Sequence, residues 1–212
     1  MGVPAPPVPP AAAESSPWVF GYGSLIYEPA HPDAVLEQRP ALLRGYRRRL
    51  NQASPGRGIP ESEATAPALS GWCEGTHRLS LAFGTEPDAE AVIEGVAFRY
   101  AAVDWPEVHA TLWRREGCGP DWPAAARHYE EARVDVSIDG LDGERPALTF
   151  LSLVDGVQTR RLTDAEVVAI LRHATPREVG ARRRGRHYVE GLGPVRIARD
   201  AWLQGIVDAL RA

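Results

Sequence analysis

The stretch Trp18-Val19-Phe20-Gly21-Tyr22-Gly23-Ser24-Leu25-Ile26 says more about the fold than any other part of this sequence. Its three leading apolar residues predict a buried strand. The two glycines that follow allow the backbone to turn sharply and to approach another group closely. A strand that ends in exposed N–H groups can receive a carboxylate or a developing oxyanion. The alternative is a tight turn that only reverses the chain, and local chemistry does not decide between the two.

Length and composition indicate an ordinary globular protein. The chain has 212 residues, of which 44% are hydrophobic, and a formal net charge of −4 at pH 7. These values favour one soluble domain with a sizeable core over a disordered or membrane chain. No apolar run approaches the roughly 18 residues of a transmembrane helix, and no secretory signal is visible. We therefore expect a cytoplasmic protein without a membrane partner.

The residue types present exclude several kinds of chemistry. The chain contains no lysine, which excludes a Schiff-base lysine, a Walker A lysine and a Ser-Lys dyad. Two cysteines, Cys73 and Cys118, are too few for a disulfide-rich scaffold or a zinc site built from four cysteines. The six histidines show no metal-ligand spacing. We therefore expect neither a metal nor a cofactor, and the role of the cysteines stays open.

Runs of charge along the chain are interpreted as solvated surface. Arg182–Arg186, and Arg44 with Arg47–Arg49, suggest nucleic-acid binding at first sight, but the acidic overall balance and the lack of a binding motif weigh against it. Glu130-Glu131 beside His128 is likewise interpreted as surface charge, because adjacent strand residues point to opposite faces.

The polar and apolar pattern divides the chain into a leader and one domain. Residues 1–17 are rich in Pro and Ala and predict a flexible leader, so the domain should span residues 18–212. Residues 52–77 predict a long irregular segment, which is either a lid or disordered. Alternating or continuous apolar residues predict further strands at 41–43, 46–50, 79–83, 92–100, 132–138 and 147–154.

Capping patterns predict three helices. The first begins at Asp104, which with Glu107 forms a capping-box pattern, and it ends before Gly117. The second begins at Thr163 with Glu166, and the third spans residues 198–210. Because strands dominate the first three quarters of the chain, the fold class is α+β with a mostly β core, in the form of a small barrel.

Several segments together resemble the gamma-glutamylcyclotransferase family, most closely its ChaC-like branch. The run Gly21-Tyr22-Gly23-Ser24-Leu25-Ile26 resembles the family signature, and weaker matches follow in the family's order over residues 18–192. These weaker matches are Gly45-Tyr46-Arg47-Arg48, Arg57-Gly58-Ile59-Pro60-Glu61, Gly95-Val96-Ala97-Phe98-Arg99 and Arg115-Glu116. The resemblance implies a compact mixed β-barrel with flanking helices. It also implies release of 5-oxoproline from a small gamma-glutamyl substrate without a cofactor.

The resemblance implies a site made of the glycine-rich turn and one carboxylate. Glu116 would serve as base and then acid, while the amides of Gly21 to Ile26 would hold the substrate, with a wall or hydroxyl from Tyr22. Tyr129 is a further candidate for a substrate hydrogen bond, with a core aromatic as its alternative. Taken without the family, Glu116 would be a surface carboxylate paired with a neighbouring arginine.

Three departures from the family pattern bear on the substrate. Residues 117–128 separate Glu116 from Tyr129, Tyr27 stands where the ChaC branch commonly has Trp, and the connection after Pro60 is longer. Gamma-glutamyl chemistry is therefore better supported than glutathione as the specific substrate. Gamma-glutamyl amino acids or amines are the alternative substrates, and a non-catalytic binding module of the same fold is the alternative function. The oligomeric state stays open.

Overall fold

The computed structural model describes residues 16–60, 73–74, 77–118, 127, 129–153, 159, 161–173 and 185–212. The chain divides into two compact units, the first made of Met1–Arg48 with Thr85–Thr159 and the second of Arg49–Gly84 with Arg160–Ala212. Two long strands, β2 (Val35–Pro60) and β4 (His77–Tyr100), run through both units. Most of the leader lies outside the described residues, and the single domain over residues 18–212 stays a prediction.

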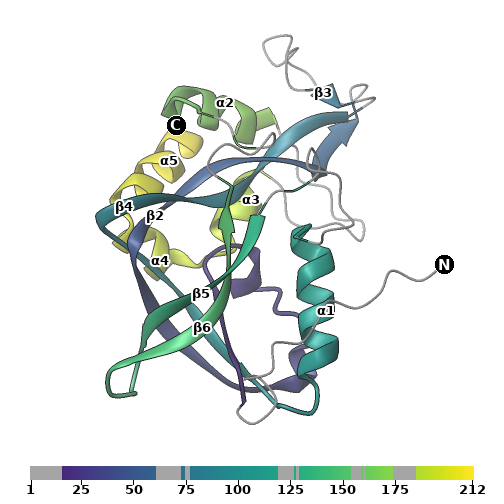
Figure 1. Cartoon of the computed structure of the whole chain (residues 1–212). Helices are drawn as coiled ribbons and strands as arrows, with labels where there is room; N and C mark the ends of the chain where they lie inside the picture. The colour runs from purple at the N-terminus through teal and green to yellow at the C-terminus, as the bar shows by residue number, and fades with distance from the viewer. Residues whose placement is uncertain are drawn as a thin grey trace, which may run out of the picture. The chain divides into compact units, whose positions relative to one another are not determined.

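The first unit holds a closed mixed β-barrel, drawn in Figure 1. The strand order β1-β6-β5-β2-β4 is closed by a pairing of β1 with β4. The short strand β1 is parallel to β6 and antiparallel to β4. The strands not yet given bounds are β1 (Trp18–Gly21), β5 (Tyr129–Ile138) and β6 (Glu144–Ser152). The expected compact mixed β-barrel with flanking helices is confirmed.

Strand lengths differ from the sequence-based expectation. The segments predicted at 41–43 and 46–50 belong to the single strand β2, which contains Gly45 at a φ of 84°. Likewise, 79–83 and 92–100 are parts of β4. The expectation of irregular structure over 52–77 is wrong for 52–60, which continue β2, for 73–74, which form a short strand, and for 77, where β4 begins. Residues 61–72 and 75–76 lie outside the described residues. The pairing of β2 with β4 explains this, because cross-strand hydrogen bonds overcome weak local strand propensity.

Helix α1 (Trp105–Glu116) flanks the barrel of the first unit and carries Glu116 at its last position. Its first-turn proline and its end at Gly117, which has a φ of 66°, are as predicted. The predicted capping box is wrong, because the Asp104 side chain accepts no capping hydrogen bond. Asp104 has a helical φ of −89° and ψ of −12°, whereas a capping side chain needs an extended backbone to reach the helix amides.

In the second unit four helices pack on one another, with α2 and α5 side by side in Figure 1. The predicted capping box of α2 is confirmed, since Thr163 and Glu166 exchange hydrogen bonds. The helix expected over 198–210 is two helices, because Asp200 is extended and its side chain caps the Leu203 amide at 3.0 Å. The short strand β3 (Cys73–Glu74) pairs with β4 in this unit. The helices are α2 (Asp164–His173), α3 (Gly185–Glu190), α4 (Pro194–Arg199) and α5 (Ala201–Arg211).

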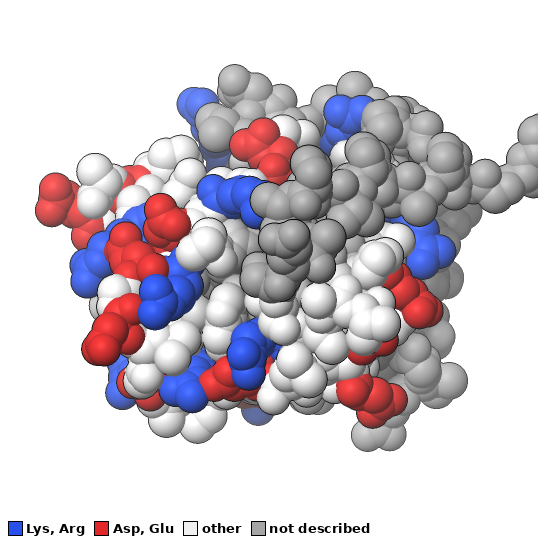
Figure 2. Space-filling view, turned by 60° about the horizontal axis from the view of Figure 1, so that its bottom comes forward, with Lys and Arg blue, Asp and Glu red and all other residues white. Residues whose placement is uncertain are grey.

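Charged residues are interspersed on the face drawn in Figure 2, where acidic and basic side chains lie next to one another. Among the described ion pairs, the carboxylate of Glu37 pairs with both Arg39 and Arg99. Residues 182–184 of the basic run at 182–186 lie outside the described residues, and Arg186 pairs with Glu190 at 2.9 Å. No helix in the described part of the chain combines the length and apolar character needed to span a membrane.

Candidate active site

The turn after β1 presents backbone donors. The short 3-10 helix η2 (Ser24–Ile26) is closed by the Ile26 amide, which donates to the Gly23 carbonyl at 3.0 Å. The amides of Tyr27 and Glu28 both donate to the Ser24 carbonyl, at 3.2 and 2.8 Å. In the described residues, the amides of Gly23, Ser24 and Leu25 donate to no backbone carbonyl. Adjacent amides of this kind can receive a carboxylate or an oxyanion.

The glycines of the turn are needed for close packing. Gly21 is not among the residues of positive φ, and Gly23 has a φ of −122°. A Cβ atom at Gly21 would lie 2.7 Å from the Cβ of Leu25, so only glycine lets the strand end meet the helical turn. From the neighbouring strand, a Cβ at Gly95 would lie 2.4 Å from the Gly21 carbonyl oxygen. Steric fit, rather than left-handed backbone, explains these two glycines.

Buried side chains fix the turn on its side toward the protein interior. Arg48 is only 3% exposed, and its Nε donates to the Tyr22 carbonyl at 2.9 Å while an Nη donates to the Glu94 carbonyl. Its assignment to a solvated charge run is therefore wrong. The Tyr22 hydroxyl donates to the Phe150 carbonyl at 2.6 Å, so its hydrogen is directed into the protein. Tyr22 thus supports the turn as a buried wall.

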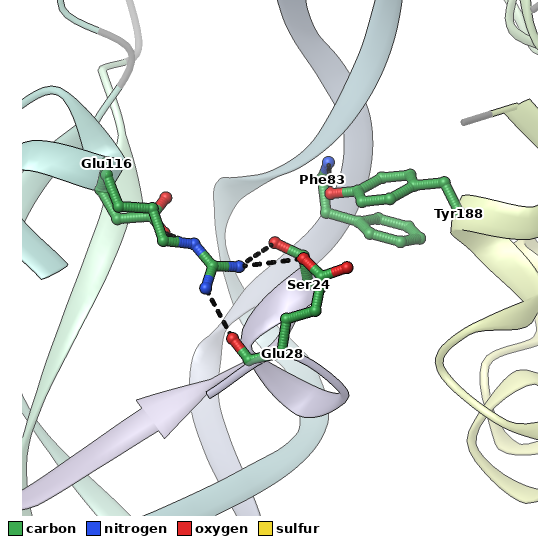
Figure 3. A network of polar contacts seen from close by, with 6 residues as sticks. Ser24, Glu28, Phe83, Glu116 and Tyr188 are labelled. Carbon is green, nitrogen blue, oxygen red and sulfur yellow. Dashed lines mark hydrogen bonds and ion pairs between the residues drawn. The ribbon is translucent and has the colours of Figure 1, made fainter. Parts of the chain in front are cut away.

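Arg115 connects the turn to Glu116 (Figure 3). One guanidinium nitrogen donates to the Ser24 hydroxyl at 2.9 Å, and another donates to the Glu28 carbonyl at 2.6 Å. Nε of Arg115 lies 3.3 Å from a carboxylate oxygen of Glu116, whose side chain is 15% exposed. The structure therefore brings together the two parts of the predicted site, the turn and the Glu116 carboxylate. Sequence reasoning named Arg115 in the match Arg115-Glu116 and as a possible partner of Glu116, but it did not foresee the contact of Arg115 with the turn.

The Cys118 thiol lies near the carboxylates of Glu116 and Glu131. The Glu131 carboxylate is 2.7 Å from Nε2 of His109, whose side chain is only 3% exposed. Glu131, interpreted from the sequence as surface charge, is 26% exposed and is paired with this buried histidine. Burial raises the pKa of the Cys118 thiol well above its usual range, and the negative charges of Glu116 and Glu131 raise it further. Three acidic groups thus share this part of the first unit.

Tyr100 anchors the loop that follows the turn. Its hydroxyl donates to the Ala30 carbonyl at 2.7 Å. Burial raises the pKa of Tyr100 to about 12, and the nearby Arg115 charge partly offsets this effect. Tyr100 therefore remains a protonated donor at neutral pH. Tyr129 begins β5 opposite Ser152 and is partly exposed, and its role in substrate binding stays a prediction.

Comparison with known proteins places this fold among related ones. A family model described as ChaC-like protein matches residues 17–170. A crystal structure of selenomethionine-labelled gamma-glutamyl cyclotransferase specific to glutathione from yeast is 17% identical, with 93% of this chain and 96% of that chain covered and a TM-score of 0.67. A second crystal structure of that yeast enzyme is 18% identical, with coverage of 93% and 98% and a TM-score of 0.64. At these identities the likeness shows a shared fold. No curated protein matches the chain.

Proposed function

Because the chain belongs to the ChaC-like protein family, we propose that it is a gamma-glutamylcyclotransferase that converts glutathione to 5-oxoproline and Cys-Gly. The observation that carries this proposal is the connection of Glu116 to the amide-rich turn through the single side chain of Arg115. The fold shared with a yeast enzyme specific to glutathione supports the choice of substrate.

The reaction is an attack within one molecule. The α-amine of the glutamyl group adds to its own γ-carbonyl carbon, a new C–N bond closes the five-membered ring, and the original amide C–N bond breaks. The amine loses a proton and the leaving nitrogen gains one, so atoms and charge balance without a redox step. Holding the glutamyl chain in a folded conformation supplies much of the rate, because nucleophile and electrophile are already joined.

Glu116 is assigned the proton transfers. The substrate ammonium first loses one proton to solvent, and the Glu116 carboxylate takes the second proton from the amine as it adds and passes it to the leaving nitrogen, which gains a further proton from solvent on release. Its place at the end of α1, with a side chain that is largely but not fully buried, suits a group that must reach a bound substrate. The guanidinium of Arg115 lies beside this carboxylate, with Nε 3.3 Å from one of its oxygens.

The turn is assigned the binding of negative charge. The amides of Gly23, Ser24 and Leu25 would donate to the substrate carboxylate or to the oxyanion that forms on the γ-carbonyl oxygen. The buried contacts of Arg48 and Tyr22 fix these donors before the substrate binds. Preorganised donors stabilise the transition state because they need not reorient during the reaction.

The test is an assay of 5-oxoproline released by purified protein. Glutathione, gamma-glutamyl amino acids and gamma-glutamyl amines are compared, so the same panel identifies the leaving group. We expect turnover of glutathione. Absence of 5-oxoproline from every compound would reject the proposal in favour of a binding module of the same fold.

The proton-transfer role is tested with Glu116→Gln. This nearly isosteric change keeps the shape but removes the proton shuttle, so turnover should fall at least about 100-fold. Binding of glutathione, measured by calorimetry, should change little. Glu107→Gln is the matched control, because Glu107 is exposed in the first turn of the same helix. Near-normal turnover by Glu116→Gln would remove Glu116 from the mechanism.

A further inference from the structure

We propose that Arg115 is a positioning residue with two tasks. It orients the Ser24 hydroxyl so that this group donates a hydrogen bond to the substrate, and it holds the Glu116 carboxylate at a fixed position relative to the turn. This inference rests on the proposed function. The sequence resemblance includes Arg115 only as the neighbour of Glu116, and this inference assigns the arginine a task of its own at the turn.

The contact between Arg115 and Ser24 determines which of the two groups donates the hydrogen bond. An arginine side chain has only donors, so the Ser24 oxygen must accept in its 2.9 Å contact with Arg115. The hydroxyl hydrogen of Ser24 therefore points away from the guanidinium and is available to another acceptor. A hydroxyl that accepts from a cation is also a stronger donor, because the two bonds polarise each other. An anionic substrate group is the acceptor that best fits such a donor.

Arg115 also fixes the backbone of the turn around Ser24. Its carbonyl accepts the amides of Tyr27 and Glu28, and the Glu28 carbonyl in turn accepts from Arg115 at 2.6 Å. Arg115 therefore holds the turn at both its first residue and its end. The guanidinium comes from a segment 91 residues away from Ser24 and 87 away from Glu28. Loss of this clamp should loosen the turn as a unit.

The same arginine contacts the carboxylate of Glu116. Arg115 lies between two carboxylates, with Nε 3.3 Å from Glu116 and an Nη 3.6 Å from Glu28. An exposed pair of this kind would contribute little. The Arg115 side chain is only 19% exposed, however, and it also carries two hydrogen bonds to the turn. The same guanidinium thus sets the position of the proposed acid/base relative to the binding donors.

A double-mutant cycle tests the action through Ser24. Ser24→Ala and Arg115→Met should each raise the KM for glutathione about 10-fold, the effect expected for one charge-assisted hydrogen bond. The double variant should show a KM no higher than that of Arg115→Met alone, because the hydrogen bond from Ser24 to the substrate depends on Arg115. Arg115→Met should also lower kcat, since it displaces Glu116. Arg114→Met is the control, because Arg114 is exposed and its side-chain hydrogen bonds to described residues stay within its own helix. Additive effects on KM, or an unchanged KM and kcat in Arg115→Met, would overturn the inference.

Hydrogen exchange tests the clamp without relying on catalysis. The amides of Tyr27 and Glu28, which both bond to the Ser24 carbonyl, should exchange at least about 10-fold faster in Arg115→Met. Arg114→Met should leave them unchanged. If the wild-type protein releases no 5-oxoproline, the proposed function fails for those substrates while this experiment still decides the clamp. Unchanged exchange in Arg115→Met would overturn it whatever the activity.

Discussion

The most exacting test of the barrel and the turn together is the substitution Gly95→Ala. Gly95 lies on β4 where that strand faces the end of β1, with the neighbouring Val96 paired to Gly21. A Cβ atom there would lie 2.4 Å from the Gly21 carbonyl oxygen and 2.6 Å from Cζ of Phe20. The residue has no positive φ, so the substitution tests steric fit alone.

The cost follows from how little these neighbours can move. The contact with Phe20 at 2.6 Å is closer by about 1 Å than the roughly 3.5 Å of a relaxed carbon–carbon contact. The Phe20 ring is fully buried, and the Gly21 oxygen belongs to a strand paired on both sides. Overpacking of this kind costs about 1–3 kcal/mol, and we expect the upper value, about 3 kcal/mol, because a backbone atom must shift.

The assay is thermal and urea unfolding of the full chain. For a protein of this length, a loss of about 3 kcal/mol should lower Tm by roughly 6–12 °C. Gly205→Ala is the control: Gly205 lies in α5, has no atom within 4 Å of an added Cβ, and should give a gain of about 0.5–1 kcal/mol. Gly95→Ala should also weaken glutathione binding, because β1 leads directly into the turn. A Gly95→Ala protein within about 1 kcal/mol of wild type would refute the steric argument.

Two further predictions concern titrating groups. Burial raises the pKa of the Cys118 thiol, so little reactive thiolate forms in the folded protein. Iodoacetamide at pH 8 should therefore label Cys118 at least about 10-fold more slowly in the folded than in the unfolded protein, as measured by mass spectrometry of the peptide that contains it. Equal labelling rates would contradict this. A hydrogen bond from the Thr163 amide, and to a smaller extent one from the Thr163 hydroxyl, lowers the pKa of Glu166 in the folded protein. The ionised carboxylate therefore stabilises the fold at pH values above the pKa of Glu166 in the unfolded chain, and this stabilisation is lost as the pH falls through the lower pKa of the folded state. The Tm difference between wild type and Glu166→Gln should therefore narrow from pH 7 to pH 3, and a constant difference would argue against the cap.

Elements with local determinants were predictable. The strand β1, the end of α1 at Gly117 and the capping box of α2 depend on residues a few positions apart, and the structure confirms them. The ends of β2 and β4 were not predictable, because pairing between the two strands extends them beyond their apolar segments. The break before α5 depends on a cap at Asp200 that the apolar spacing does not reveal.

The candidate site was predictable only in part. The turn and Glu116 were identified through a family resemblance that the match over residues 17–170 confirms, while their roles stay predictions. The contacts of Arg48 and Arg115 with the turn were not predictable, because single arginines within charged runs carry no local sign of burial. Only contacts with carbonyls or hydroxyls 26 to 91 residues away distinguish them. The cytoplasmic location, and the lack of nucleic-acid and membrane partners, also stay predictions.

The sequence by itself determined that an apolar strand ends in a glycine-rich turn, and that a helix ends at Glu116. Both depend on the residue types at neighbouring positions. Only the tertiary structure decided why Gly21 must be glycine, and which side chain joins the turn to the helix. The reason is physical: steric fit and hydrogen bonding act between atoms in contact, and the atoms in contact with Gly21 and Ser24 include Phe98 and Arg115, which lie far along the chain.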